Sequence, residues 1–134
     1  MQDYESFSLR LKTLKSMDFD RDISEASYRS HIISQYNVTL TTASQALRTL
    51  LKKQGTRPEQ IATPQEVLIQ ARMKGYIKDS GPWVAMLQDK KMNTFFWDET
   101  KREERIEEIR KIFIPAFDEL EEALEEEYAS RTSQ

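Results

Sequence analysis

The chain has 134 residues, of which 38% are hydrophobic and 32% charged, and its formal net charge is -3. This length suits one ordinary domain, and three glycines and four prolines are too few for many turns between strands, so we expect one all-α domain over residues 1–134. The negative net charge excludes a long-range attraction for nucleic acids. The absence of cysteine excludes disulfides and thiolate metal sites and favours a cytoplasmic location.

Two amphipathic helices are predicted in the first half of the chain. The first, over residues 4–17, has apolar side chains at steps of three and four: Tyr4, Phe7, Leu11 and Leu14. The second, over residues 23–54, carries a longer stripe of the same kind: Tyr28, Ile32, Ile33, Tyr36, Leu40, Ala43, Leu47, Leu50 and Leu51. We expect Asp22 and Glu25 to form its capping box and Gly55 to end it in a left-handed conformation.

Two shorter helices are predicted next. Thr63, Pro64 and Glu66 form the start signal of the first, and Gly75 is its expected end. The second opens at residues 80–82, Ser-Gly-Pro, and carries four apolar residues: Trp83, Val84, Met86 and Leu87.

The last predicted helix begins with a capping box formed by Thr100 and Glu103. Its apolar residues again recur at steps of three or four: Ile106, Ile109, Phe113, Phe117, Leu120 and Leu124. Pro115 removes one backbone hydrogen bond, so we expect a kink near residues 111–114 and no break. Residues 128–134 are predicted to form a disordered tail. Together the elements predict an up-and-down four-helix bundle with an additional short helix.

Residue types that catalyse reactions or bind cofactors are few in this sequence. The three glycines do not have the spacing of a phosphate-binding loop. The single histidine, His31, lacks the glutamate three residues earlier that a di-iron helical bundle requires, because position 28 is tyrosine. The acidic run over residues 118–127 is typical of a solvated helix face. We therefore predict no cofactor, no metal site and no catalytic residue.

The segment from Asp89 to Asp98 interrupts the helical pattern and holds the candidate binding residues: Lys90, Lys91, Asn93, Phe95, Trp97 and Asp98. In a functional interpretation, the two lysines contact phosphates and Trp97 stacks on a base, as in proteins that bind nucleotides or single-stranded nucleic acid. In a structural interpretation, Phe95 and Trp97 close one end of the bundle or a dimer contact. The sequence leaves both interpretations open.

Several landmarks between Asp22 and Leu124 have an informative order and spacing. They are residues 51–55 (Leu-Lys-Lys-Gln-Gly), 63–67 (Thr-Pro-Gln-Glu-Val), Ala71, 75–77 (Gly-Tyr-Ile), Trp83, 86–87 (Met-Leu) and the segment 89–99. In these landmarks the chain resembles the nucleotidyltransferase substrate-binding proteins of the HEPN superfamily. The resemblance implies a HEPN-like helical bundle, a homodimer, and a separate minimal nucleotidyltransferase as its partner.

The chain departs from this family's pattern at the reactive positions. Relatives typically read Asp-Arg-Asn-x-x-x-His-x-Tyr-Asp-Glu over residues 89–99, and in ribonuclease members the arginine and histidine act on RNA, while the tyrosine is adenylylated in some systems. In this chain the family's arginine falls on Lys90, its asparagine on Lys91, its histidine on Phe95 and its tyrosine on Trp97. Phenylalanine cannot exchange a proton and tryptophan has no hydroxyl to accept a nucleotide. The family's Gln-Arg-Phe-Glu also reads Ser-Gln-Tyr-Asn over residues 34–37.

Three hypotheses follow from these observations. The first is a non-catalytic, homodimeric partner that binds a minimal nucleotidyltransferase or helps present its substrate, with a nucleotide or RNA contact left open. The second is an RNA-cleaving enzyme of the toxin–antitoxin kind with a rebuilt site of Lys90, Lys91 and His31. The third is a purely structural oligomeric bundle whose aromatic segment is an interface. The loss of the reactive side chains favours the first.

Overall fold

The structure, a computed structural model, describes residues 2–19, 26–91 and 99–132. Every regular element in these ranges is helical, so the all-α prediction is confirmed. The long elements are α1 (Gln2–Lys15), α2 (Ala26–Lys53) and a rod made of α5 (Glu99–Glu108), the π-helical segment η3 (Ile109–Phe113) and α6 (Ile114–Thr132). The short elements are the 3-10 turn η1 (Pro58–Gln60), α3 (Pro64–Met73) and α4 (Gly81–Lys91).

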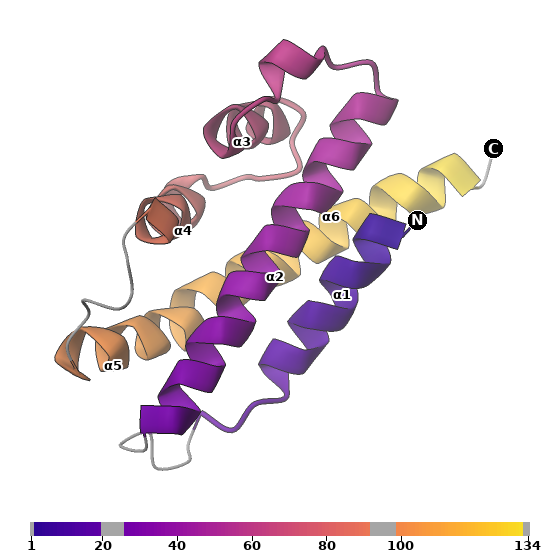
Figure 1. The fold of residues 1–134 in the computed structure, drawn as a ribbon. Coiled ribbons are helices and arrows are strands. Elements are labelled where there is room, and N and C mark those ends of the chain that lie inside the picture. Colours follow the sequence, from indigo (N-terminus) through magenta and orange to yellow (C-terminus); the bar gives the residue numbers. More distant parts are fainter. Residues whose placement is uncertain (1, 20–25, 92–98, 133–134) are drawn as a thin grey trace.

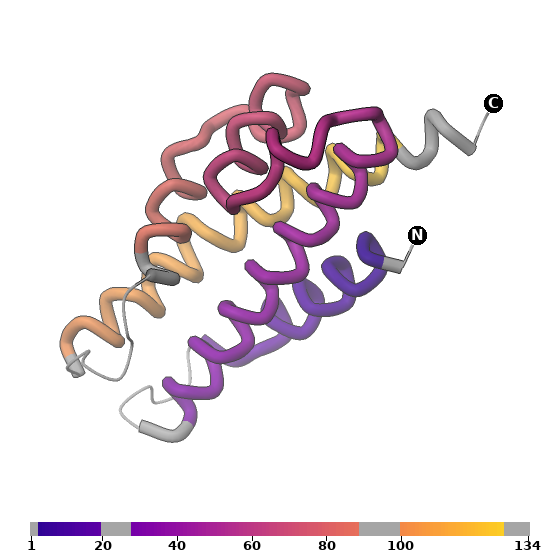
Figure 2. The backbone as a smooth tube through the Cα atoms, turned by 45° about the horizontal axis from the view of Figure 1, so that its top comes forward, coloured from indigo at the N-terminus to yellow at the C-terminus, as the bar shows by residue number. Residues whose placement is uncertain are grey.

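The helices are arranged around α2 (Figure 1). Helix α1 packs along one side of α2 and also contacts α6, while α3 and α4 lie on the other side of α2. Figure 1 shows α3 and α4 nearly end-on, so they cross the long helices. The start of α1 and the end of α6 lie at the same end of the molecule (Figure 2). The predicted helical bundle is therefore confirmed, with its two short helices set across the long ones. Among the described residues, no helix is long and apolar enough to cross a membrane.

The start of α3 and the ends of α2 and α3 lie where the sequence predicts them. Thr63 caps α3, because its hydroxyl accepts a hydrogen bond from the Glu66 backbone N–H at 3.2 Å, and Pro64 occupies the first turn. Gly55 and Gly75 follow α2 and α3 with φ angles of 90° and 84°, a left-handed conformation that costs glycine least. The capping box predicted at the start of α2 lies outside the described residues.

The last helix begins earlier than the sequence predicts. It begins at Glu99, so Thr100 lies inside its first turn and is not the capping residue. It continues through Pro115 as predicted, and the preceding turn is the wider π-helical segment η3. The π-turn makes room for the proline ring, which would otherwise press on the carbonyl four residues earlier. The helix extends to Thr132.

The core centres on Phe117 of α6, which is fully buried and meets aromatic rings from three other helices. Phe7 of α1 and Trp83 of α4 approach it edge-on, with centroid distances of 6.1 and 5.5 Å. Tyr36 of α2 lies 6.3 Å away and stacks on Phe113 of η3 at 5.5 Å. Edge-on and offset ring pairs stabilise a core beyond their burial alone. One aromatic cluster therefore joins α1, α2, α4 and the last rod.

Replacing Phe117 by alanine is expected to lower the free energy of unfolding by about 3–5 kcal/mol, because it leaves a cavity where four elements meet. Urea denaturation followed by circular dichroism measures the change. The control is Leu9→Ala, at a side chain that is 62% exposed, and it is expected to change this free energy by no more than about 0.5 kcal/mol. Equal losses in the two variants would contradict a core centred on Phe117.

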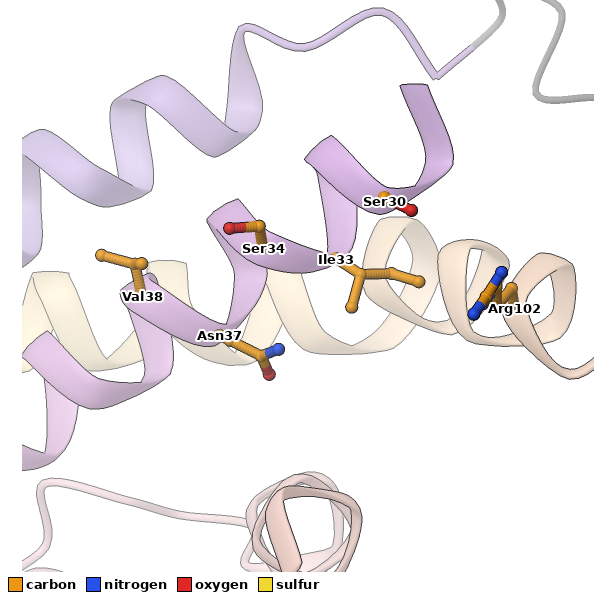
Figure 3. A pocket seen from close by; sticks show the side chains of 6 residues that line it. All are labelled: Ser30, Ile33, Ser34, Asn37, Val38 and Arg102. Atoms are coloured by element: carbon orange, nitrogen blue, oxygen red, sulfur yellow. The ribbon is translucent and has the colours of Figure 1, made fainter. Parts of the chain in front are cut away.

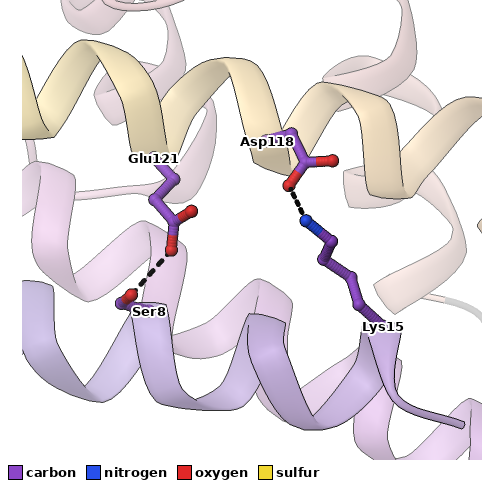
Figure 4. Close-up of polar contacts among 4 residues, drawn as sticks. All are labelled: Ser8, Lys15, Asp118 and Glu121. Carbon is purple, nitrogen blue, oxygen red and sulfur yellow. Dashed lines mark hydrogen bonds and ion pairs between the residues drawn. The ribbon is translucent and has the colours of Figure 1, made fainter.

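Polar contacts between α1 and α6 use part of the acidic run. Ser8 donates a hydrogen bond to Glu121 at 2.6 Å, and Lys15 donates one to Asp118 at 2.8 Å (Figure 4). The hydrogen bond to Asp118 raises the pKa of Lys15. The acidic run is thus not only the solvated face that the sequence predicts, although four of its side chains are exposed: Glu119, Glu122, Glu125 and Glu126.

Tyr4 makes the same interface sensitive to alkaline pH. Burial raises the pKa of its phenol, and the hydrogen bond with Glu125 and the negative charge of Glu121 raise it further. Above about pH 10 the unfolded phenol loses its proton while the folded one keeps it, so the free energy of unfolding falls as pH rises. We expect Tyr4→Phe to remove this contribution and to show a shallower decline in urea denaturation between about pH 9 and 11. A decline as steep as that of the unchanged protein would show that Tyr4 ionises alike in both states.

Candidate functional site

A groove lies between the N-terminal half of α2 and the start of α5. Its volume is about 270 Å³, and six side chains line it: Ser30, Ile33, Ser34, Asn37, Val38 and Arg102. The first five recur at helical spacing on one face of α2, and Arg102 comes from α5 (Figure 3). Because α2 and α5 contact each other, the groove brings together residues that are far apart in the sequence.

The polar side chains of this groove are not used by the fold. In the part of the chain that the structure describes, those of Ser30, Ser34, Asn37 and Arg102 take part in no hydrogen bond or ion pair. Other hydroxyls of α2 donate to backbone carbonyls three or four residues earlier, at 2.8 to 3.0 Å: Thr39, Thr41 and Thr42. The groove therefore presents two hydroxyls, one amide and one guanidinium to a ligand.

Two further arginines of α2 and α5 are buried and do not line the groove. Arg29 on α2 is 1% exposed, and Arg105, one turn after Arg102 on α5, is 8% exposed. Arg105 donates to Glu108 at 2.6 Å and lies 5.6 Å from the ring centroid of Phe113. The Arg105 guanidinium is thus held by contacts inside the fold, whereas that of Arg102 lines the groove.

A second groove, between α1 and α6, has a different electrostatic character. Its volume is about 260 Å³, and it is lined by Ser8, Leu11, Lys12, Lys15, Glu121 and Glu125. Carboxylates and ammonium groups stand side by side in it, and four of its side chains are already engaged between the helices: Ser8 with Glu121, Lys15 with Asp118, and Glu125 with Tyr4. Adjacent opposite charges cancel much of each other's field. The α2–α5 groove is therefore the better candidate for a site that binds a charged ligand.

The structure places only part of the predicted binding segment. Lys90 and Lys91 form the end of α4, so this helix extends into the segment that the sequence predicts to interrupt the helical pattern. Their side chains are outside the described part of the structure. The other four candidates also lie outside the described residues: Asn93, Phe95, Trp97 and Asp98. The binding roles of all six residues stay predictions.

His31 stands apart from the groove. Its side chain is exposed on α2 and is not among the lining residues. Among residues 2–19, 26–91 and 99–132, no group of three or more His, Cys, Asp or Glu side chains is placed to hold a metal ion. The described structure therefore does not join His31 to any site.

Comparison with known protein families accounts for nearly the whole chain. Residues 2–126 match the family described as "Nucleotidyltransferase substrate binding protein like". The chain belongs to this family. The match runs from the start of α1 through most of α6, and it confirms the predicted resemblance to nucleotidyltransferase substrate-binding proteins. No curated protein and no solved structure matches the chain.

None of the six groove residues is among the binding residues that the sequence analysis predicts, and Arg102 is the charged one. It lies between Thr100 and Glu103, the two residues of the predicted capping box. A usable signal is nevertheless present, because Arg102 stands four and seven residues before Ile106 and Ile109 and so shares their apolar face.

The two arginines of α5 provide a test of this description. Arg102→Ala is expected to change the free energy of unfolding by less than about 0.5 kcal/mol, because no contact in the described structure depends on its guanidinium. Arg105→Ala is expected to lower it by about 1–3 kcal/mol, because Glu108 loses its donor and the guanidinium no longer lies over the ring of Phe113. Urea denaturation of both variants measures the difference. An equal loss of unfolding free energy in the two variants would contradict the description of Arg102 as a groove residue and Arg105 as a buried, paired residue.

Proposed function

We propose that the chain is a non-catalytic partner of a minimal nucleotidyltransferase, which it binds or to which it helps present a substrate. The observation that carries this proposal is the family match over residues 2–126. Both helices that form the α2–α5 groove lie within the matched range. A groove with unused hydrogen-bonding groups is the kind of surface that a substrate-binding role requires.

The chemistry of the groove supports a non-catalytic role. Its polar groups are hydroxyls, an amide and a guanidinium, none of which exchanges protons readily near neutral pH. Where the resemblance implies a histidine and a tyrosine, the chain has Phe95 and Trp97. Cleavage of RNA would then depend on Lys90, Lys91 and His31.

The proposal includes a HEPN-like homodimer that acts in the cytoplasm. Five large apolar side chains remain exposed and offer surface for a second copy or for the transferase: Leu9, Ile69, Met73, Val84 and Ile112. Single exposed apolar residues are common, so these five support an interface without locating it. The lack of cysteine agrees with a reducing compartment.

Co-expression tests the proposed function. We expect the affinity-tagged chain and the small nucleotidyltransferase encoded beside it to elute together from a size-exclusion column, with an unrelated tagged bundle of similar size as the control. The chain alone is expected to elute as a dimer. Separate elution of the two folded proteins would contradict the partnership. Cleavage of RNA by the purified chain that is lost in Lys90→Ala would contradict the non-catalytic role.

A further inference from the structure

We propose that the outer face of α3 is the surface on which the chain binds its partner protein, and that the partner supplies an apolar groove with an acidic rim. Ile69 and Met73 are the apolar anchors of this face, and Arg72 is its central charge. The inference rests on the proposed function, because it takes the nucleotidyltransferase as that partner. It adds the location and the chemistry of the contact.

Helix α3 exposes apolar side chains on the face that it turns away from the core. Val67, Leu68 and Ala71 are buried, whereas Ile69 and Met73 are 56% and 75% exposed. Residues four apart on a helix are neighbours on its surface, so these two side chains form one continuous apolar spot. Helix α3 lies at the outside of the bundle, on the side of α2 opposite α1 (Figure 1). Another protein can therefore reach this spot.

The spacing of the exposed residues suits a helix that inserts into a groove of another protein. Helices that bind in this way present anchors at steps of three, four and seven residues. On α3, Ile69, Arg72 and Met73 stand at such steps, and both methionine and arginine are enriched at protein interfaces. A stable interface buries about 800 Å² on each partner. The two apolar side chains are thus its anchors, and the polar residues around them form its rim.

Positive charge accompanies the apolar spot. Arg72 and Lys74 on α3 and Lys78 in the loop that follows are all exposed. The Arg72 guanidinium donates to the Ser80 hydroxyl at 3.4 Å, which leaves further N–H donors for a partner. Residues 52–79 contain six Lys and Arg and three Asp and Glu residues, so they carry a charge of +3 in a chain of net charge -3. The surface that complements this face is acidic.

A second copy of the chain fits this face less well than a different protein does. Two α3 helices related by a two-fold axis would bring the cations of both copies together, and like charges repel. The rod of residues 99–132, with twelve Asp and Glu and six Lys and Arg residues, has the complementary charge. A contact between the rod of one copy and α3 of another joins two different surfaces, however, so it builds a ring or an open chain of copies. We therefore take the transferase as the occupant.

The α3 face is separate from the α2–α5 groove. The side chains that line the groove come from α2 and α5, and none of the six belongs to α3. One chain can therefore hold its partner on α3 while the groove stays open.

Calorimetric titration of the full chain with the small nucleotidyltransferase encoded beside it measures the contact. The double change Ile69→Ala and Met73→Ala is expected to weaken binding by roughly tenfold or more, because the anchors of an interface carry most of its binding energy. Alanine keeps the helix propensity of α3, and urea denaturation verifies that the variant is folded. Arg72→Glu is expected to weaken binding by a similar factor. The affinity of the unchanged chain should fall as salt is added, and that of Arg72→Glu should fall less.

Matched controls make the same kinds of change elsewhere on the surface. The double change Leu9→Ala and Ile112→Ala removes two other apolar side chains, which are 62% and 45% exposed. Arg10→Glu reverses the charge of an exposed arginine on α1. Both control variants are expected to bind the transferase as the unchanged chain does. Equal weakening in the control and α3 variants would overturn the inference, because it would show attraction that is not confined to α3.

The remaining outcomes separate this inference from the proposed function. If the transferase binds the unchanged chain and the α3 variants equally well, the inference is overturned and the partnership stands. If the transferase does not bind the unchanged chain, both are overturned. Sedimentation of the Ile69→Ala and Met73→Ala variant gives a further test. A change from dimer to monomer with unaltered transferase binding would show that this face joins two copies of the chain, and it would overturn the inference as well.

Discussion

Packing around the ring of Phe117 is the constraint on which the rest of this structure depends. Phe7, Trp83 and Tyr36 reach that ring from α1, α4 and α2. Because α5, η3 and α6 form one continuous rod, the position of α6 in the core also sets where α5 lies beside α2. The proposed site is formed by α2 and α5, so its shape is a consequence of aromatic packing about four helical turns away along the rod.

Arg102 and Arg105 lie one turn apart on α5 and have different surroundings. Arg105 points into the fold, where Glu108 and the ring of Phe113 hold its guanidinium. Arg102 stands one turn earlier on the same helix and lines the α2–α5 groove. A buried cation is costly unless it is paired, so the fold fixes Arg105. Arg102 remains solvated at the edge of the groove and is available to a ligand.

The acidic half of α6 illustrates how tertiary contacts change the meaning of a sequence pattern. Read along the chain, residues 118–127 are a run of negative charge. In the structure, part of that run faces α1, where Ser8 and Lys15 donate to Glu121 and Asp118. Exposed pairs of this kind contribute little to stability individually. Their effect is to fix which faces of α1 and α6 meet. The buried apolar side chains of α1, which are Phe7, Leu11 and Leu14, supply the stability.

The sequence by itself determined the helical class, the approximate bounds of the helices, the glycine ends at Gly55 and Gly75, and the family. These follow from periodicity, caps and the order of landmarks, which are local properties that neighbouring residues express through backbone geometry. The groove was decided only by the tertiary structure. Ser30, Asn37 and Arg102 acquire a common role because α2 and α5 pack together, and no local rule specifies which faces of two helices meet.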